Sequence, residues 1–186
     1  MGFFGKLFEK KECAICGGEI ELTNANIEHL DALISKLANN NCRFWIKKGK
    51  IIMQSSKKHK AISKIETMPY PGFPTDLQPL FSTLMAYGMG GAYTDTVFPE
   101  RFSHLLALSP FGVGFYKVMD RIIVPRIKLR LTASVTAPDL RGGAACLLAA
   151  LATGGESRIL AAEKILRGYE RPWEKLSALG ADIRLV

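Results

Sequence analysis

The chain has 186 residues, of which 48% are hydrophobic and 23% charged, and its formal net charge is +8. This length and composition suffice for a buried core without disulfides, and they exclude a disordered chain. No apolar run is long enough to cross a membrane, and the first residues become charged too early for a signal peptide. We therefore expect a cytoplasmic protein with no membrane span.

The first motif is the pair Cys13 and Cys16, followed by two glycines. This spacing is typical of half a zinc ribbon, and a closed zinc site needs a second pair of ligands. The other two cysteines stand alone, and Cys146 lies in an apolar segment where a thiol packs as a small hydrophobe. The opening resembles the start of a small bacterial zinc-binding domain. We predict an N-terminal extension, residues 1–16, with a candidate half-site for metal, and one domain at residues 17–186.

The domain begins with strand and helix patterns next to a basic cluster. Apolar periodicity predicts a strand at 19–23, a helix at 27–38 and a strand pair at 42–47 and 50–54. The cluster starts at the turn of that pair and consists of Lys47, Lys48, Lys50, Lys57, Lys58, Lys60 and Lys64. It would attract phosphates, nucleic acid included, but charge runs are more often solvated loops. Because no nucleic-acid-binding motif accompanies the lysines, we expect no nucleic-acid partner.

A second group of elements starts at Thr75. The spacing of Thr75 and Gln78 predicts a capping box at the start of a helix with a regular apolar stripe. Further strands are predicted at 92–98, 115–118, 121–124, 128–135, 157–160 and 182–185, and further helices at 101–108, 140–151 and 169–179. Strands and helices alternate along the whole domain, which indicates the α/β class.

Two segments of this half repeat one another at constant spacing. Asp76 recurs as Asp139, each followed by leucine and an apolar helix, and Gly91 recurs as Gly154. Each aspartate stands at a helix entrance, a position that binds anions. A repeat predicts a stacked architecture, so we expect three β-α-β-α-β-β units around a pseudo-threefold axis, the first incomplete and the last cut short. Helices should lie inside, because 144–151 is apolar nearly all round.

Four motifs are specific enough to compare with known families: YPGFPTDLQ at 70–78, TVFPERF at 96–102, DLR at 139–141 and RGYER at 167–171. They resemble the enolpyruvyl transferases, in particular the C-terminal half of UDP-N-acetylglucosamine 1-carboxyvinyltransferase. The resemblance implies an inside-out α/β barrel domain, which in the family faces a second such domain across a cleft. It also implies transfer of an enolpyruvyl group from phosphoenolpyruvate to the 3-hydroxyl of UDP-N-acetylglucosamine in peptidoglycan synthesis, without a cofactor.

The resemblance assigns roles to seven residues. Asp76 matches an aspartate that contacts the sugar 3-hydroxyl, and a carboxylate within reach of that group can take its proton. Arg141 and Arg167 match arginines that grip phosphoenolpyruvate, since guanidinium forks suit carboxylate and phosphate. The other four match the nucleotide-sugar pocket and its supporting partners: Val97, Phe98, Arg101 and Asp139. From the residues alone, Asp76 could instead stabilise its helix N-terminus, and each arginine could lie at the surface.

Three positions depart from the family pattern, because Glu100, Pro138 and Leu166 stand where the family has asparagine, threonine and aspartate. The N-terminal half of the family, with its general-acid cysteine loop and lysine-asparagine pair, has no counterpart here. We therefore expect a truncated or split enzyme that is inactive as an isolated chain and needs a separate N-terminal-half chain, since half of the electrostatic stabilisation is missing. The alternative is a catalytically inactive module that binds a nucleotide sugar or another anion.

Overall fold

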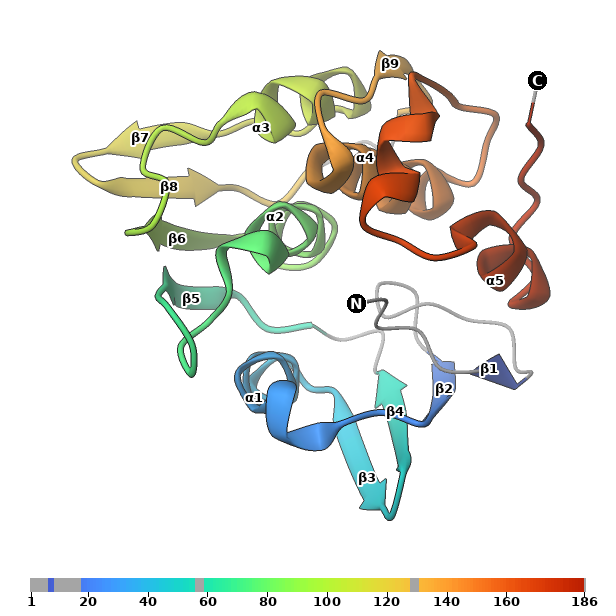
Figure 1. Cartoon of the computed structure of the whole chain (residues 1–186). Coiled ribbons are helices and arrows are strands. Elements are labelled where there is room, and N and C mark those ends of the chain that lie inside the picture. The colour runs from blue at the N-terminus through green and yellow to red at the C-terminus, as the bar shows by residue number, and fades with distance from the viewer. Residues whose placement is uncertain (1–6, 9–17, 56–58, 128–130, 186) are drawn as a thin grey trace. The chain divides into compact units, whose positions relative to one another are not determined.

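The computed structural model describes residues 7–8, 18–55, 59–127 and 131–185 (Figure 1). The chain divides into two compact units. The split unit consists of residues 1–59 and 166–186, and the central unit consists of residues 60–165. No helix in the described part of the chain is long and apolar enough to span a membrane.

The split unit contains an antiparallel sheet with strand order β1-β2-β4-β3. Its strands are β1 (Leu7–Phe8), β2 (Gly18–Thr23), β3 (Arg43–Lys47) and β4 (Lys50–Ser55). Gly49 turns the chain between β3 and β4 with a φ of +71°, which glycine adopts without strain. The three strands predicted in this region are confirmed. The helix predicted at 27–38 forms in two pieces, η1 (Ile27–His29) and α1 (Asp31–Asn39).

The C-terminal part of the split unit holds the helix α5 (Pro172–Ala178). The helix predicted at 169–179 begins later, at Pro172, because the first helical position needs no N–H donor and so suits proline. The strand predicted at 182–185 is wrong. Ile183 and Leu185 alternate with charged residues as in a strand, but no described strand pairs with them, and Leu185 is 71% exposed.

The central unit begins with the predicted β-α-β-α-β-β order. Its elements are β5 (Ile62–Thr67), α2 (Gln78–Tyr87), β6 (Gly91–Asp95), α3 (Ser103–Leu108), β7 (Tyr116–Val118) and β8 (Arg121–Val124). The sheet order is β5-β6-β8-β7, with β5 parallel to β6 and the other pairs antiparallel. The apolar pattern does not predict β5, because a register shift between Ile62 and Ile65 breaks the alternation that marks a strand.

The second copy of the repeat lies in the same unit. Its elements are β9 (Ser134–Thr136), α4 (Leu140–Thr153) and β10 (Arg158–Leu160), and β9 is parallel to β10. The 3-10 helix η4 (Ala162–Arg167) follows, and its last two residues belong to the split unit. The strand predicted at 128–135 begins at Ser134 in the described part of the chain, and residues 128–130 of that prediction lie outside it. Both copies form a parallel strand-helix-strand crossover, as the repeat predicts. The helix exits differ, because Gly154 caps α4 at a φ of +78° whereas Gly91 already lies in β6.

Helices α2 and α4 pack against each other in the core of the central unit (Figure 1). Thr83 Oγ1 of α2 donates to the Ala145 carbonyl of α4 at 3.2 Å, and the Tyr87 hydroxyl donates to the Ala149 carbonyl at 3.3 Å. Nine of the ten α2 residues are buried, so its regular stripe does not make it an amphipathic surface helix. The burial of these helices agrees with the predicted inside-out α/β fold.

Candidate active site

Asp76 contacts two arginines that come from distant parts of the central unit. Asp76 lies in the 3-10 turn η2 (Thr75–Leu77) just before α2, whereas Arg101 precedes α3 and Arg141 lies in the first turn of α4. The Arg141 Nε donates to Asp76 Oδ1, and Arg101 Nη1 lies 3.7 Å from the same oxygen. The Asp76 side chain is 58% exposed, whereas those of Arg101 and Arg141 are 18% and 26% exposed. A ligand can therefore reach the carboxylate, and the three groups together keep a positive charge.

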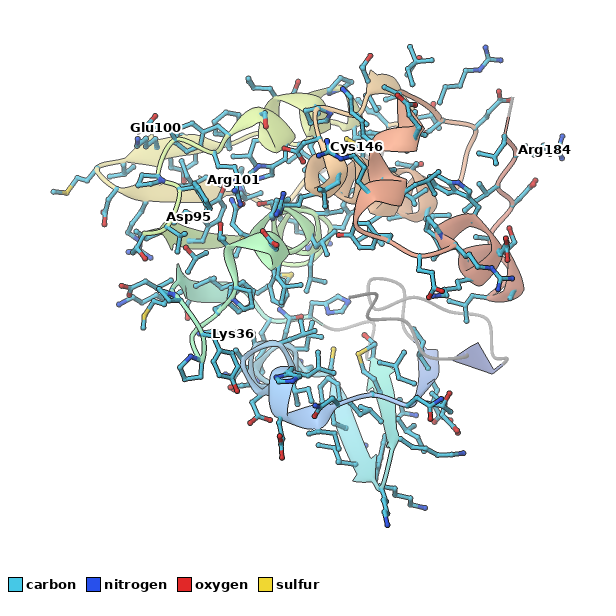
Figure 2. All side chains as sticks on the ribbon, viewed as in Figure 1. Lys36, Asp95, Glu100, Arg101, Cys146 and Arg184 are labelled. Carbon is cyan, nitrogen blue, oxygen red and sulfur yellow. The ribbon has the colours of Figure 1, made fainter. Side chains whose placement is uncertain are left out.

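Asp95, at the end of β6, organises the residues next to Arg101 (Figure 2). The Asp95 side chain is buried, and its Oδ1 accepts from Thr67 Oγ1 at 2.6 Å and from the Val97 and Phe98 N–H groups at 3.0 and 2.8 Å. Its Oδ2 accepts from the Thr75 hydroxyl at 2.7 Å. Burial alone would raise the pKa of Asp95, but the four hydrogen bonds outweigh burial and lower that pKa.

Phe98 and Arg101 stack at the edge of a surface hollow. The Arg101 guanidinium carbon lies 4.0 Å from the centre of the Phe98 ring, in a cation–π contact. The hollow has a volume of about 380 Å³ and is lined by Val97, Phe98, Pro99, Glu100 and Arg101. Val97 and Phe98 are both exposed there. The hollow therefore presents an aromatic ring, a cation and a carboxylate to a ligand.

Asp139 holds the start of α4. Its Oδ1 accepts from the Arg141 and Gly142 N–H groups, both at 2.8 Å, so Asp139 is the N-cap of the helix. This cap fixes the backbone from which the Arg141 side chain extends toward Asp76. Because the two N–H groups already have a carboxylate partner, an anion at this helix entrance would meet the Arg141 side chain instead of these groups.

The predicted capping box at Thr75 and Gln78 is wrong. Thr75 Oγ1 donates to Asp95 and accepts from Arg101 Nη1 at 3.0 Å, and no side chain caps η2 or α2. The Gln78 amide is instead buried, with its Nε2 3.3 Å from His104 Nε2. Thr75 lies inside η2, after the N-cap residue Pro74, and its hydroxyl oxygen accepts from Arg101 instead of a backbone N–H group.

Buried polar side chains from α2 and β6 surround His104 in α3. Gln78 Nε2, Ser82 Oγ and Tyr93 OH lie 3.3, 3.2 and 3.5 Å from His104 Nε2. Burial lowers the pKa of His104 to about 4, against an opposing effect of the Asp139 charge. At neutral pH the imidazole is therefore uncharged, so one ring nitrogen carries a proton and the other can accept a hydrogen bond.

The other predicted site residues are Arg167, Cys13 and Cys16. Arg167 is exposed at the end of η4 and belongs to the split unit, so its place in the site stays a prediction. Cys13 and Cys16 lie outside the described residues, among which no group of three His, Cys, Asp or Glu side chains could hold a metal ion. Cys146 is buried as a small hydrophobe, and burial raises its pKa to about 12.

The sequence motifs do not point to Asp95, Thr67 or His104. One signal was available for Asp95, because it lies at the carboxyl end of a strand of the α/β sheet, and ligands bind outside the carboxyl ends of parallel strands in such sheets. The predicted strand at 92–98 hid this signal, since β6 ends at Asp95 and the chain turns there. His104 gave no signal, because a single histidine in an apolar helix is indistinguishable from a core residue.

Comparison with known proteins agrees with this geometry. Residues 12–176 match the family described as EPSP synthase (3-phosphoshikimate 1-carboxyvinyltransferase). The chain belongs to this enolpyruvyl transferase family. UDP-N-acetylglucosamine 1-carboxyvinyltransferase 1 from Streptococcus agalactiae is 38% identical over 174 residues, 93% of this chain and 41% of the relative. UDP-N-acetylglucosamine 1-carboxyvinyltransferase 2 from Caldanaerobacter subterraneus is 40% identical over 172 residues, 91% of this chain and 41% of the relative.

Two solved structures place the fold among the enolpyruvyl transferases. The enolpyruvyl transferase NikO from Streptomyces tendae matches with a TM-score of 0.79 and 26% identity, over 88% of this chain and 39% of that chain. EPSP synthase from Acinetobacter baumannii matches with a TM-score of 0.62 and 15% identity, over 83% of this chain and 39% of that chain, and shows the fold alone. The chain thus spans less than half of the length of its curated relatives, corresponding to their C-terminal half.

Proposed function

We propose that the chain supplies one side of an enolpyruvyl transferase site that acts on phosphoenolpyruvate and UDP-N-acetylglucosamine in peptidoglycan synthesis. The observation that carries this proposal is the contact of Asp76 with Arg101 and Arg141, which brings three separate segments together. The family match supports the reaction class, and the names of the relatives support the choice of substrates. A cytoplasmic location and a reaction without a cofactor belong to the same proposal.

Asp76 is the base in this proposal. The sugar 3-hydroxyl oxygen forms a bond to the enol carbon of phosphoenolpyruvate, the hydroxyl proton passes to the Asp76 carboxylate, and a general acid outside this chain protonates the neighbouring methylene carbon. Loss of a proton from that methyl group then restores the double bond as the bond from the enol carbon to the phosphate oxygen breaks, and the phosphate leaves with this oxygen. Arg141 binds phosphoenolpyruvate, since its guanidinium presents a fork that matches carboxylate and phosphate. For Arg167 the same role rests on the family resemblance alone.

The ion pair between Asp76 and Arg141 gives this base a way to respond to substrate. An anion that binds Arg141 competes with Asp76 for the guanidinium and frees the carboxylate for the sugar hydroxyl. Arg101 stays in place, because it stacks on Phe98 and donates to Thr75. The hollow beside Phe98 receives the nucleotide sugar.

For the isolated chain we propose substrate binding without turnover. The charge that develops on the phosphate and the enol carbon must be stabilised from several directions, and the chain matches only 41% of the length of its relatives. A region that corresponds to the rest of those relatives, supplied as a separate chain, would complete the site. The alternative is a catalytically inactive module that binds a nucleotide sugar or another anion.

Phosphate release from phosphoenolpyruvate in the presence of UDP-N-acetylglucosamine tests the proposal. We expect no release from the chain alone and measurable release after addition of the N-terminal part of the Streptococcus agalactiae relative. Asp76→Asn should abolish this release, whereas Asp120→Asn on the turn between β7 and β8 makes the same charge change and should preserve it. Release that survives Asp76→Asn contradicts the assigned base. A complex that binds both substrates without release favours the inactive module.

A further inference from the structure

Four hydrogen bonds converge on the buried carboxylate of Asp95, and they come from both sides of the candidate site. One side is η2, through the Thr75 hydroxyl, and the other is the turn after β6, through the Val97 and Phe98 N–H groups. Thr67 at the end of β5 supplies the fourth bond. Each of these groups is a donor, so the carboxylate is the common acceptor that joins them.

We propose that Asp95 is a positioning residue of this site, which acts on Arg101 and Asp76 through the hydroxyl of Thr75. The proposal rests on the proposed function only for the identity of the ligand. It assigns to Asp95 no contact with substrate. Its role is to fix the geometry of groups that touch substrate, which a loose supporting shell would leave mobile.

The Thr75 hydroxyl transmits the effect because it has a single proton. The Asp95 carboxylate can only accept, so the Thr75 proton points to Asp95 Oδ2 at 2.7 Å. The lone pairs of the same oxygen then face Arg101, whose Nη1 donates to it at 3.0 Å. Asp95 thereby sets the direction of a hydroxyl that anchors Arg101, and that nitrogen of Arg101 also lies 3.7 Å from Asp76 Oδ1.

The substitution Asp95→Asn would reverse this arrangement in either orientation of the amide. If the amide oxygen takes the place of Oδ1, its NH₂ group faces the Thr75 hydroxyl, which must then turn its proton toward Arg101. If the amide is flipped, the NH₂ group meets the three donors from Thr67, Val97 and Phe98. A donor would face a donor in both cases.

The test compares four variants of the full chain by two measurements. The first is the NMR signal of the Arg101 side-chain Nε–H without ligand, and the second is the affinity for phosphoenolpyruvate at low salt. We expect Asp95→Asn and Thr75→Val each to move the Arg101 signal and to weaken binding about tenfold, as for the loss of one charge-assisted hydrogen bond. Thr75→Ser keeps the hydroxyl and should restore both. Thr83→Val removes a buried hydroxyl that donates to the Ala145 carbonyl. This control should lower stability but leave the Arg101 signal and the affinity for phosphoenolpyruvate unchanged.

The double variant Asp95→Asn with Thr75→Val gives a second criterion. Because both changes break the same connection, we expect binding by the double variant to be no weaker than by either single variant. Losses of affinity that multiply would overturn the proposal. An unchanged Arg101 signal in Thr75→Val and Asp95→Asn would also overturn it and leave Asp95 a structural residue. If the unmodified chain binds no phosphoenolpyruvate, the proposed function fails, and the Arg101 signal alone still decides the role of Asp95.

Discussion

Three aspartates of the central unit have different roles because their surroundings differ. Asp95 is buried and accepts four hydrogen bonds, and Asp139 accepts two backbone N–H groups as the cap of α4. Asp76 bonds to arginine side chains and keeps more than half of its side chain exposed. At the residue scale, Asp76 is the exposed carboxylate of the three and the most accessible to a ligand. The other two hold the groups around it in place.

The first prediction at this scale concerns Asp76→Asn. Loss of the carboxylate frees the guanidinium of Arg141 from its ion pair, so we expect inorganic phosphate to bind the isolated chain severalfold more tightly. The unfolding free energy should change by less than about 1 kcal/mol, because exposed ion pairs contribute little. Phosphate titration and urea unfolding measure the two effects, with Asp120→Asn as the control for net charge. Weaker phosphate binding by Asp76→Asn than by the control would contradict the assignment.

A second prediction concerns His104 and pH. Its folded-state pKa of about 4 lies below the ordinary 6.5, so the unfolded chain binds a proton first as the pH falls. Stability should therefore decrease from about pH 6.5 to about pH 4, by roughly 3 kcal/mol, and this loss should be absent above pH 6.5. The lowered pKa of Asp95 acts only below this window.

Urea unfolding between pH 4 and pH 7 measures this effect. His104→Gln removes the titrating group. As the pH falls from 7 to 4, the unfolding free energy of this variant should therefore decrease less steeply than that of the unmodified chain, whatever the stability of the variant at pH 7. A slope equal to that of the unmodified chain would show that His104 is not buried as a neutral imidazole.

At the element scale, the start of α4 depends on close packing by two glycines. A Cβ on Gly143 would lie 2.8 Å from Ile165 Cγ1 and 3.0 Å from Ala137 Cβ, and one on Gly142 would lie 2.5 Å from Pro138 Cγ. The loop before α4 is also held by Lys164 Nζ, which donates to the Ala137 carbonyl at 2.9 Å. The position of Arg141 therefore depends on small residues beside it.

The third prediction follows from this packing. Gly143→Ala should destabilise the chain by about 1–2 kcal/mol, because the overlap with Ile165 and Ala137 exceeds the gain of about 1 kcal/mol in helix propensity. Gly114→Ala is the matched control, since its Cβ would meet nothing within 4 Å. It should be neutral or slightly stabilising. Chemical unfolding of both variants measures the difference, and equal effects would contradict the close packing.

Much of the element pattern could be predicted from the sequence, since periodicity fixes the strands β2, β3 and β4 and the helix α4. The misses have local causes. Strand β5 carries a bulge, and Thr75 bonds to Asp95 instead of capping its helix. Asp76 and Arg141 could be named from motifs, but their contact could not, because it depends on the packing of η2 against the start of α4. The support from Asp95 is likewise a tertiary feature.

At the scale of the whole molecule, the chain belongs to the enolpyruvyl transferase family. It matches less than half of the length of its relatives. The net charge of +8 attracts anions to the whole chain. Specific binding at Arg101 and Arg141 must be stronger than this general attraction. The three lysines of the β3–β4 hairpin are exposed, and Lys50 pairs with Glu21 at 2.6 Å. A measurement must therefore separate specific binding at the cluster from binding at this hairpin.

A fourth prediction concerns salt. Phosphoenolpyruvate should bind the isolated chain with millimolar affinity, about −4 kcal/mol. Raising the salt concentration should weaken this binding, because the side chains of Arg101 and Arg141 are partly exposed to solvent ions. Calorimetric titration at two salt concentrations measures this dependence. Affinity that is independent of salt would be inconsistent with binding through exposed charges.

Amide chemical shifts of the isotope-labelled chain during titration with phosphoenolpyruvate test the central claim most directly. The claim is that Asp76, Arg101 and Arg141 form one side of a transferase site. We predict that the largest shifts occur at these three residues and at Phe98, and that they saturate together. Shifts that cluster instead on the exposed hairpin lysines Lys47, Lys48 and Lys50, with none at Asp76 or Arg141, would contradict it.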